Sequence, residues 1–151
     1  MKTAIKAIKA RLEEAISLPG FSVPLFDATG CLPPYAMVWT YPATASYELA
    51  VDGAGPTSGD VYVTCVAGTG LGALLVVEEV EDALGVRGRA TARIESNGVR
   101  LDVGRMRISQ PVQADRNTTI EKTNRHPFYA VVAFPITIQP IGAPDVSEDG
   151  V

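Results

Sequence analysis

The chain is short of the residues on which most catalytic and metal sites depend. Its 151 residues include one histidine, His126, and two cysteines, Cys31 and Cys65. Zinc sites are built from several such ligands at close spacing, and a histidine-based triad needs a nucleophile beside its base. The cysteines form no Cys-x-x-Cys pair, and we expect them to stay reduced. We therefore expect no metal, no cofactor and no enzymatic activity, with His126 in a surface or capping role.

Long apolar runs are also missing. The longest uncharged apolar stretch, residues 128–138, contains Pro135 and is far shorter than the roughly 20 residues that span a bilayer. The N-terminal segment MKTAIKAIKARLEEAI has no continuous apolar core of the kind that signal peptides contain. We expect no membrane association and a protein that is made and assembled in the cytoplasm.

Charge is present but segregated along the chain. Residues 1–11 carry four basic groups and no acid, whereas residues 12–86 carry ten acids and no lysine or arginine. Residues 87–125 carry nine basic groups against four acids, and the remainder carries three acids, for a net charge of −4. If the signs stay apart on the surface, each copy offers two unlike patches, which suits head-to-tail association that closes into a ring. If they mingle in space, the pattern says nothing about association.

The remaining composition, 46% apolar and 20% charged, is that of a globular domain. Apolar spacings of three and four residues predict a helix over residues 3–17, which Pro19-Gly20 ends. A second helix is expected over about residues 70–84, followed by Gly85 as its C-terminal cap. Its exposed side would carry four acids, Glu78, Glu79, Glu81 and Asp82.

Aromatic and β-branched residues predict strands over residues 35–41, 60–67, 89–94, 99–103, 105–109 and 128–139, and less clearly over 47–51. The segment 60–67 is apolar on both faces, which indicates a central strand. Asn97-Gly98 predicts a two-residue hairpin, and Pro135 an edge or a bulge. Residues 20–34 are expected to form a loop.

This order of elements predicts an α+β fold with a mainly antiparallel or mixed β-sheet flanked by two α-helices in two layers. We expect one domain over residues 1–141 and a flexible acidic tail over residues 142–151.

A glycine-rich turn offers the one pattern that resembles a ligand-binding motif. Gly68, Gly70 and Gly72 follow a predicted strand and open a predicted helix, which is where a phosphate-binding turn belongs. The dinucleotide fingerprint needs the spacing G-x-G-x-x-G, however, and no lysine follows as in a Walker A loop. We interpret the segment as a tight turn with Thr69 as N-cap, and keep a small nucleotide-binding protein as an alternative.

The charged residues favour protein contacts over other partners. The helical acids radiate from their helix and do not converge on one point, so they suit a solvated face or a basic neighbour. No aromatic residue interrupts residues 87–127, and the isoelectric point of about 5.0 also weighs against nucleic-acid binding. Arginine is enriched at protein interfaces. The candidate interface residues are Glu78, Glu79, Glu81, Asp82, Arg105, Arg107, Arg116 and Arg125.

The layout as a whole is similar to a known family. A basic N-terminal helix precedes a proline-rich loop with a first strand (LPPYAMVW, 32–39), a strand–helix unit (VYVTCVAGTGLGALLVVEEVEDAL, 61–84) and a closing strand (FYAVVAF, 128–134). This order resembles the tail terminator proteins of long-tailed bacteriophages. The resemblance covers residues 1–141 and rests on the order and texture of the elements.

The resemblance implies a structural virion protein of the tail–neck region. It implies a homo-oligomeric ring, a hexamer, that ends polymerisation of the tail tube protein and joins the tail to head-completion or connector proteins. DNA would pass through the lumen without specific binding, and acids such as Glu78 and Glu79 lining it would repel phosphate. Residues 110–125 and the acidic tail are the candidate docking segments. Another head–tail connector or neck component, or a tail tube subunit, remains the neighbouring alternative.

Overall fold

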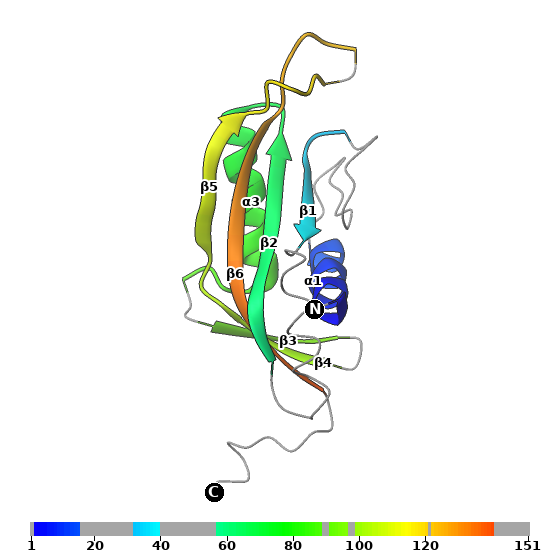
Figure 1. Ribbon diagram of the computed structural model, residues 1–151, viewed down its shortest axis with the longest axis vertical. Coiled ribbons are helices and arrows are strands. Elements are labelled where there is room, and N and C mark those ends of the chain that lie inside the picture. The colour runs from blue at the N-terminus through cyan, green and yellow to red at the C-terminus, as the bar shows by residue number, and fades with distance from the viewer. Residues whose placement is uncertain are drawn as a thin grey trace, which may run out of the picture.

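Antiparallel strands with two helices on one side form the part of the chain that the structure describes (Figure 1). The structure is a computed structural model that describes residues 2–15, 32–39, 57–88, 91–96, 99–120 and 122–140. Its elements are α1 (Lys2–Ala15), β1 (Tyr35–Trp39), β2 (Thr57–Ala67), α3 (Gly70–Leu84), β3 (Thr91–Ser96), β4 (Val99–Gly104), β5 (Arg107–Ala114) and β6 (Phe128–Pro140). The predicted α+β class is confirmed, with all strand pairs antiparallel.

Strand β6 is the spine of the sheet. Along one edge it pairs with β2 over the whole length of β2, from Thr57–Ile138 to Ala67–Phe128. Along its other edge it pairs first with β5 and then with β4, so that the strand order is β1-β2-β6-β4-β3 with β5 beside β6. Strand β2 lies between β1 and β6, which confirms the prediction of a central strand from its two apolar faces.

Pro135 lies where β6 exchanges one partner for the other. The last β5 pair is Arg107 with Ala133, and the first β4 pair is Val103 with Ile136. Because proline has no N–H to donate, it fits the point at which the ladder is interrupted. The sequence predicted an edge or a bulge here, whereas Pro135 lies inside a central strand at a change of partner. A Cβ on Gly104 would lie 2.7 Å from the Pro135 Cγ, so any larger residue would require the chain or the proline ring to shift.

The core fills the space between the sheet and the helices. Alternate residues of the two central strands, among them Val61, Val63 and Phe134, are fully buried against both helices. Helix α1 contributes Ile5, Ile8 and Leu12, whose 3–4 spacing predicted this face, together with the buried Ala7. Each such side chain contributes about 1.5–3 kcal/mol by leaving water. The packing of α1 and α3 on one face therefore supplies most of the described core.

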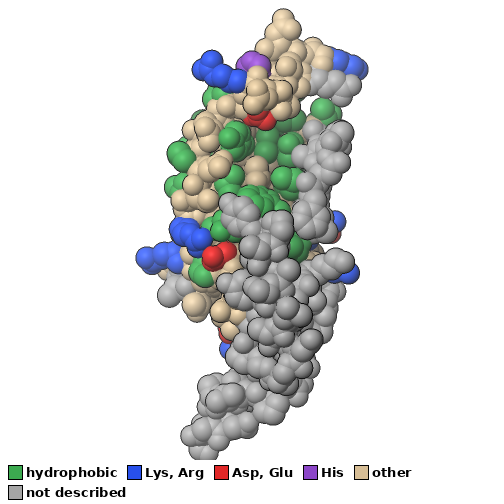
Figure 2. Space-filling view, in the orientation of Figure 1, with side chains coloured by type: hydrophobic (Ala, Val, Ile, Leu, Met, Phe, Trp, Pro, Cys, Tyr) green, Lys and Arg blue, Asp and Glu red, His purple; other side chains and the backbone are tan. Residues whose placement is uncertain are grey.

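The opposite face of the sheet is also apolar. Trp39 of β1 stacks on Tyr62 of β2 with ring centroids 4.7 Å apart, and its Nε1–H donates to the Thr64 hydroxyl at 2.8 Å. Val131 and Ala133 of β6 are buried beside them. Figure 2 shows hydrophobic side chains gathered on this face.

Several boundaries differ from the sequence prediction. Strand β5 starts at Arg107 and continues to Ala114 through Pro111, with register irregularities, so the segment 110–125 is partly a strand and not wholly a polar connection. Ser96 pairs with Val99, as a two-residue hairpin at Asn97-Gly98 requires, although those two residues lie outside the described ranges. The predicted loop before Leu32, the 47–51 strand, Cys31 and the acidic tail also lie outside them. No helix in the described ranges is long and apolar enough to cross a membrane.

Candidate interaction surface

The glycine turn fixes the start of α3. The Thr69 hydroxyl accepts from the Gly72 N–H at 3.0 Å, and the Thr69 carbonyl accepts from the Ala73 N–H at 3.0 Å, which confirms Thr69 as N-cap. A Cβ on Gly72 would lie 2.9 Å from the Ala67 Cβ and 3.0 Å from the Thr69 hydroxyl oxygen. Close packing of the helix against the end of β2 therefore accounts for Gly72. The predicted C-terminal cap is confirmed at Gly85, with φ of 76° and its N–H bonded to helical carbonyls.

The outward face of α3 begins with three exposed leucines. Leu71, Leu74 and Leu75 are 70%, 49% and 50% exposed, while the opposite side of the helix is buried. Their spacing of three and four residues places them side by side over the first turns. Their exposure was not predicted from the sequence, because they lie in the apolar run GALLVV, in which inward and outward positions look alike. The acids that follow one turn further on mark the outward side of the helix, and from them the exposure of these leucines could have been inferred.

Two acids of α3, one helical turn apart, lie close to Arg87. The Arg87 guanidinium lies 3.7 Å from Glu78 and 3.2 Å from Asp82. Glu81 is partly buried, and burial raises the pKa of its carboxyl above the ordinary value, with Arg87 opposing the shift and Asp82 and Glu78 adding to it. The structure thus brings Glu78, Glu81 and Asp82 together with Arg87 at one end of the helix, whereas Glu79 lies outside this cluster.

Most arginines of the sheet are neutralised within the fold. Ion pairs join Arg93 to Asp102 and Arg100 to Glu95 at 3.0 Å each, across neighbouring strands β3 and β4. Both acids belong to the same basic segment as the arginines, whereas Arg87 and Arg107 pair with acids of the preceding acidic segment, so the segregated charges mingle in part. The basic patch expected on the strands is reduced accordingly.

Arg107, a predicted interface residue, is held by an acid of its own chain. Its guanidinium reaches across β6 to Asp60 of β2 at 3.2 Å. This hydrogen bond raises the pKa of Arg107 above its ordinary value. Arg107 therefore fastens β5 to the sheet and offers less free charge than the sequence suggested.

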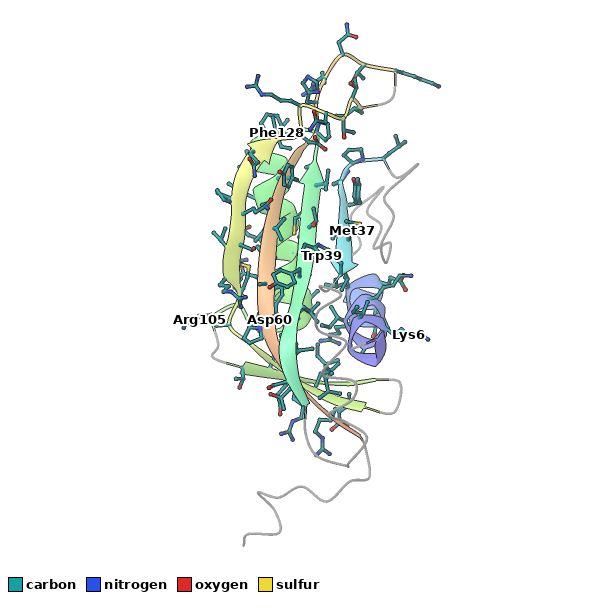
Figure 3. The ribbon with its side chains drawn as sticks, in the orientation of Figure 1. Lys6, Met37, Trp39, Asp60, Arg105 and Phe128 are labelled. Carbon is teal, nitrogen blue, oxygen red and sulfur yellow. The ribbon has the colours of Figure 1, made fainter. Side chains whose placement is uncertain are left out.

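Arg105 and Arg116 keep their charge free of any ion pair within the described part of the chain. Arg105 lies in the connection between β4 and β5 and points away from the sheet (Figure 3). Arg116 lies two residues after the end of β5 and is exposed. A third predicted residue, Arg125, makes one contact at 3.5 Å from its Nη2 to the Gly68 carbonyl.

Residues 115–127, which we call the β5–β6 arm, project beyond the end of the sheet (Figure 1). Backbone bonds close it at its base, from the Asp115 N–H to the Pro127 carbonyl, and near its tip, from Ile120 to Arg125, both at 2.8 Å. The Nδ1 of His126 lies 2.7 Å from the Thr118 carbonyl. Because a carbonyl can only accept, Nδ1 carries the proton there. His126 is thus an arm-stabilising residue, consistent with the expected surface or capping role.

A groove of about 530 Å³ separates the first half of α3 from the start of β1 and the base of the arm. Its lining is mainly apolar and consists of Pro34, Ala67, Gly68, Thr69, Gly72, Leu75, Val76, Glu79 and Arg125. At 1.5 Å per helical residue, Glu79 lies roughly 15 Å along the helix from Gly68, on which Arg125 rests. One end of the groove is therefore basic and the other acidic, with leucine between them.

The described residues offer few groups for metal binding or for nucleophilic chemistry. They contain no group of three or more histidine, cysteine or acidic side chains that could hold a metal ion. Cys65 is fully buried, and burial raises the pKa of its thiol well above the ordinary value. No protein-family model matches the chain, and a search of curated proteins found no match either.

Proposed function

We propose that the protein is a structural virion protein, a tail terminator of a long-tailed bacteriophage. It assembles into a hexameric ring that ends polymerisation of the tail tube protein and joins the tail to the head-completion or connector proteins. The support is the order of elements, a small α+β domain with a closing strand as the spine of its sheet. Assembly takes place in the host cytoplasm, and the protein then resides in the tail–neck region of the virion.

The observation that carries the proposal is the charge that remains after internal pairing. Within the described residues, unpaired positive charge lies at Arg105 and Arg116. In the same residues Glu79 and Glu81 form no ion pair, unlike Glu78 and Asp82, which pair with Arg87. Unlike patches on different elements suit a heterologous contact, which propagates from copy to copy until a ring closes. We assign this contact to the Glu81 flank of α3 in one copy and Arg105 of the next.

The exposed leucines indicate which surface of such a ring the outward face of α3 can occupy. A helix face with three exposed leucines is unfavourable against a water-filled channel, because apolar surface gains free energy by leaving water. We therefore place this face in contact with protein, and no longer assign Glu78 and Glu79 to the DNA channel. DNA passes through the lumen without specific binding, in keeping with the net charge of −4.

Native mass spectrometry and negative-stain imaging of the purified chain test the ring. We expect a closed hexamer, and we expect Arg105→Glu and Glu81→Lys each to weaken it by placing like charges in contact. Combining the two changes should restore assembly, and Lys6→Glu on α1 serves as a control charge reversal. A chain that stays monomeric at all concentrations and gains thermal stability from a nucleotide would contradict the proposal.

A neighbouring neck component is the second candidate, because head–tail connectors of similar size have similar α/β sequence patterns. Copy number separates the two, since a closed ring other than a hexamer favours a connector. The nucleotide-binding alternative is less favoured, because close packing against Ala67 already explains why residue 72 is a glycine.

A further inference from the structure

The groove beside α3 is self-complementary. Along the helix the groove is basic at Arg125, apolar at Leu75 and acidic at Glu79, which belongs to the same acidic turn as Asp82. Leu74 is exposed beside Leu75 but does not line the groove. Leu74 and Leu75 lie midway in sequence between Gly68, which Arg125 contacts, and that acidic turn. A two-fold rotation about an axis beside these leucines exchanges the basic and acidic ends.

We propose that two copies of this chain pair through antiparallel α3 helices, related by a two-fold axis that passes beside Leu74 and Leu75. Arg125 of each copy then lies opposite the acidic turn of the other, and the exposed leucines of each enter the groove of the other. The contact is isologous, so every attractive charge pair occurs twice. The occupant of the groove is a second copy of the same chain.

Burial and charge both favour this occupant. The three leucines are adjacent and between 49% and 70% exposed, a patch of the kind that marks interaction sites. A partner helix that buries them must itself be apolar at its centre and carry opposite charges at its ends. The α3 face meets this requirement when it runs antiparallel to itself.

Other surfaces of the described chain are less suited to pairing. The free edge of β5 is interrupted by Pro111 and by two register shifts, which are devices that discourage strand addition. The hollow lined by Asp60, Asp102 and Pro135 lies over β2, β6 and β4, and its neighbouring arginines are already paired with these acids.

The pair does not rest on the proposed ring. Two residues apart on a helix is about 200° of rotation, so Glu79 faces the groove while Glu81 faces nearly the opposite flank. A two-fold contact closes at two copies and cannot propagate a ring. It therefore joins two free copies, or two rings face to face, and is centred on the groove side of α3, whereas the Arg105 contact is centred on the Glu81 flank.

Self-cross-linking is the decisive test, because only a residue near a two-fold axis meets its own counterpart. We expect Leu75→Cys to form an intermolecular disulfide under mild oxidation, seen as a doubled mass on a non-reducing gel. Ile108→Cys is the matched control: Ile108 is 62% exposed on β5, away from the axis, and should cross-link no more than the unmodified chain. Equal cross-linking of the two variants would overturn the pair.

A charge exchange tests the register by sedimentation equilibrium, in an Arg105→Glu background that removes the ring contact. We expect Arg125→Glu and Glu79→Arg each to weaken pairing by about tenfold. The double variant should regain most of the lost affinity, and failure to do so overturns the register. If rings form but Leu75→Cys does not cross-link, the α3 pair is refuted and the ring is not. If Leu75→Cys cross-links but no rings form, the ring is refuted and the α3 pair is not.

Discussion

At the scale of single residues, Gly72 shows how a glycine motif arises from packing. The hydrogen it carries in place of a side chain lets α3 approach β2, since a Cβ would lie 2.9 Å from that of Ala67. We predict that Gly72→Ala destabilises the fold by about 1–3 kcal/mol, the usual cost of overpacking. Gly70→Ala is the control, because its Cβ would meet Val112 at an ordinary 3.5 Å. Urea denaturation measures both, and equal stability of the two variants would contradict the packing role.

Glu81 gives a residue-scale prediction about pH. Burial raises its pKa in the folded state, so the folded chain holds this proton more tightly than the unfolded chain does. Stability from this group is therefore present at acidic pH and is lost as pH rises from the unfolded pKa through the raised folded pKa. Glu81→Gln should be more stable than the native chain at neutral pH, with the difference closing as pH falls.

Denaturation midpoints measured across pH 4 to 8 at one low protein concentration provide the check. Glu13→Gln, at an exposed position on α1, is the matched control and should show no such convergence. A Glu81→Gln advantage that grows toward acidic pH would reverse the sign and contradict the account.

At the scale of elements, β6 is the strand on which the sheet depends. It pairs with β2, β5 and β4 and carries Phe134, which is fully buried between sheet and helices. We predict a loss of about 3–5 kcal/mol for Phe134→Ala, from lost burial and the cavity left behind. Ile108→Ala, on the exposed side of β5, should change stability by less than about 0.5 kcal/mol. Thermal unfolding would contradict this ranking if the two losses were equal.

Element prediction from sequence succeeded where a periodic pattern coincided with a chemical boundary. Helix α3 lies between Thr69 and Gly85, whose capping chemistry is legible in the sequence, and its bounds agree with the expected range. Strand β5 extends past its predicted end because tertiary pairing with β6 overrides the poor strand propensity of Pro111. The exposed leucines escaped detection because exposure depends on which face of α3 meets the sheet, and a continuous apolar run does not record that.

At the scale of the whole molecule, sequence segregation of charge is a weaker guide than it first looked. Arg93 and Arg100 pair with acids on the neighbouring strand, and Arg107 pairs with Asp60, which is 47 residues away in sequence and lies beyond β6. Hairpin register and the position of β2 determine these partners, and neither follows from a count of charges along the chain. The groups left available for assembly after this internal pairing are Arg105 and the β5–β6 arm, and the charged and apolar outward face of α3.

The two proposed contacts should respond differently to salt, because one is mainly electrostatic and the other has an apolar centre. The Debye length falls from about 10 Å at 0.1 M to about 3 Å at 1 M salt, which screens exposed charges. The Arg105–Glu81 contact should weaken over this range, so that rings dissociate. The α3 pair should persist, since burial of Leu71, Leu74 and Leu75 is not screened and strengthens in salts that are excluded from the surface. Sedimentation velocity across a salt series would therefore show rings giving way to dimers, and Leu74→Asp should convert those dimers to monomers. Rings that survive 1 M salt while the Leu75→Cys cross-link disappears would mean that the two contacts have been assigned the wrong way round.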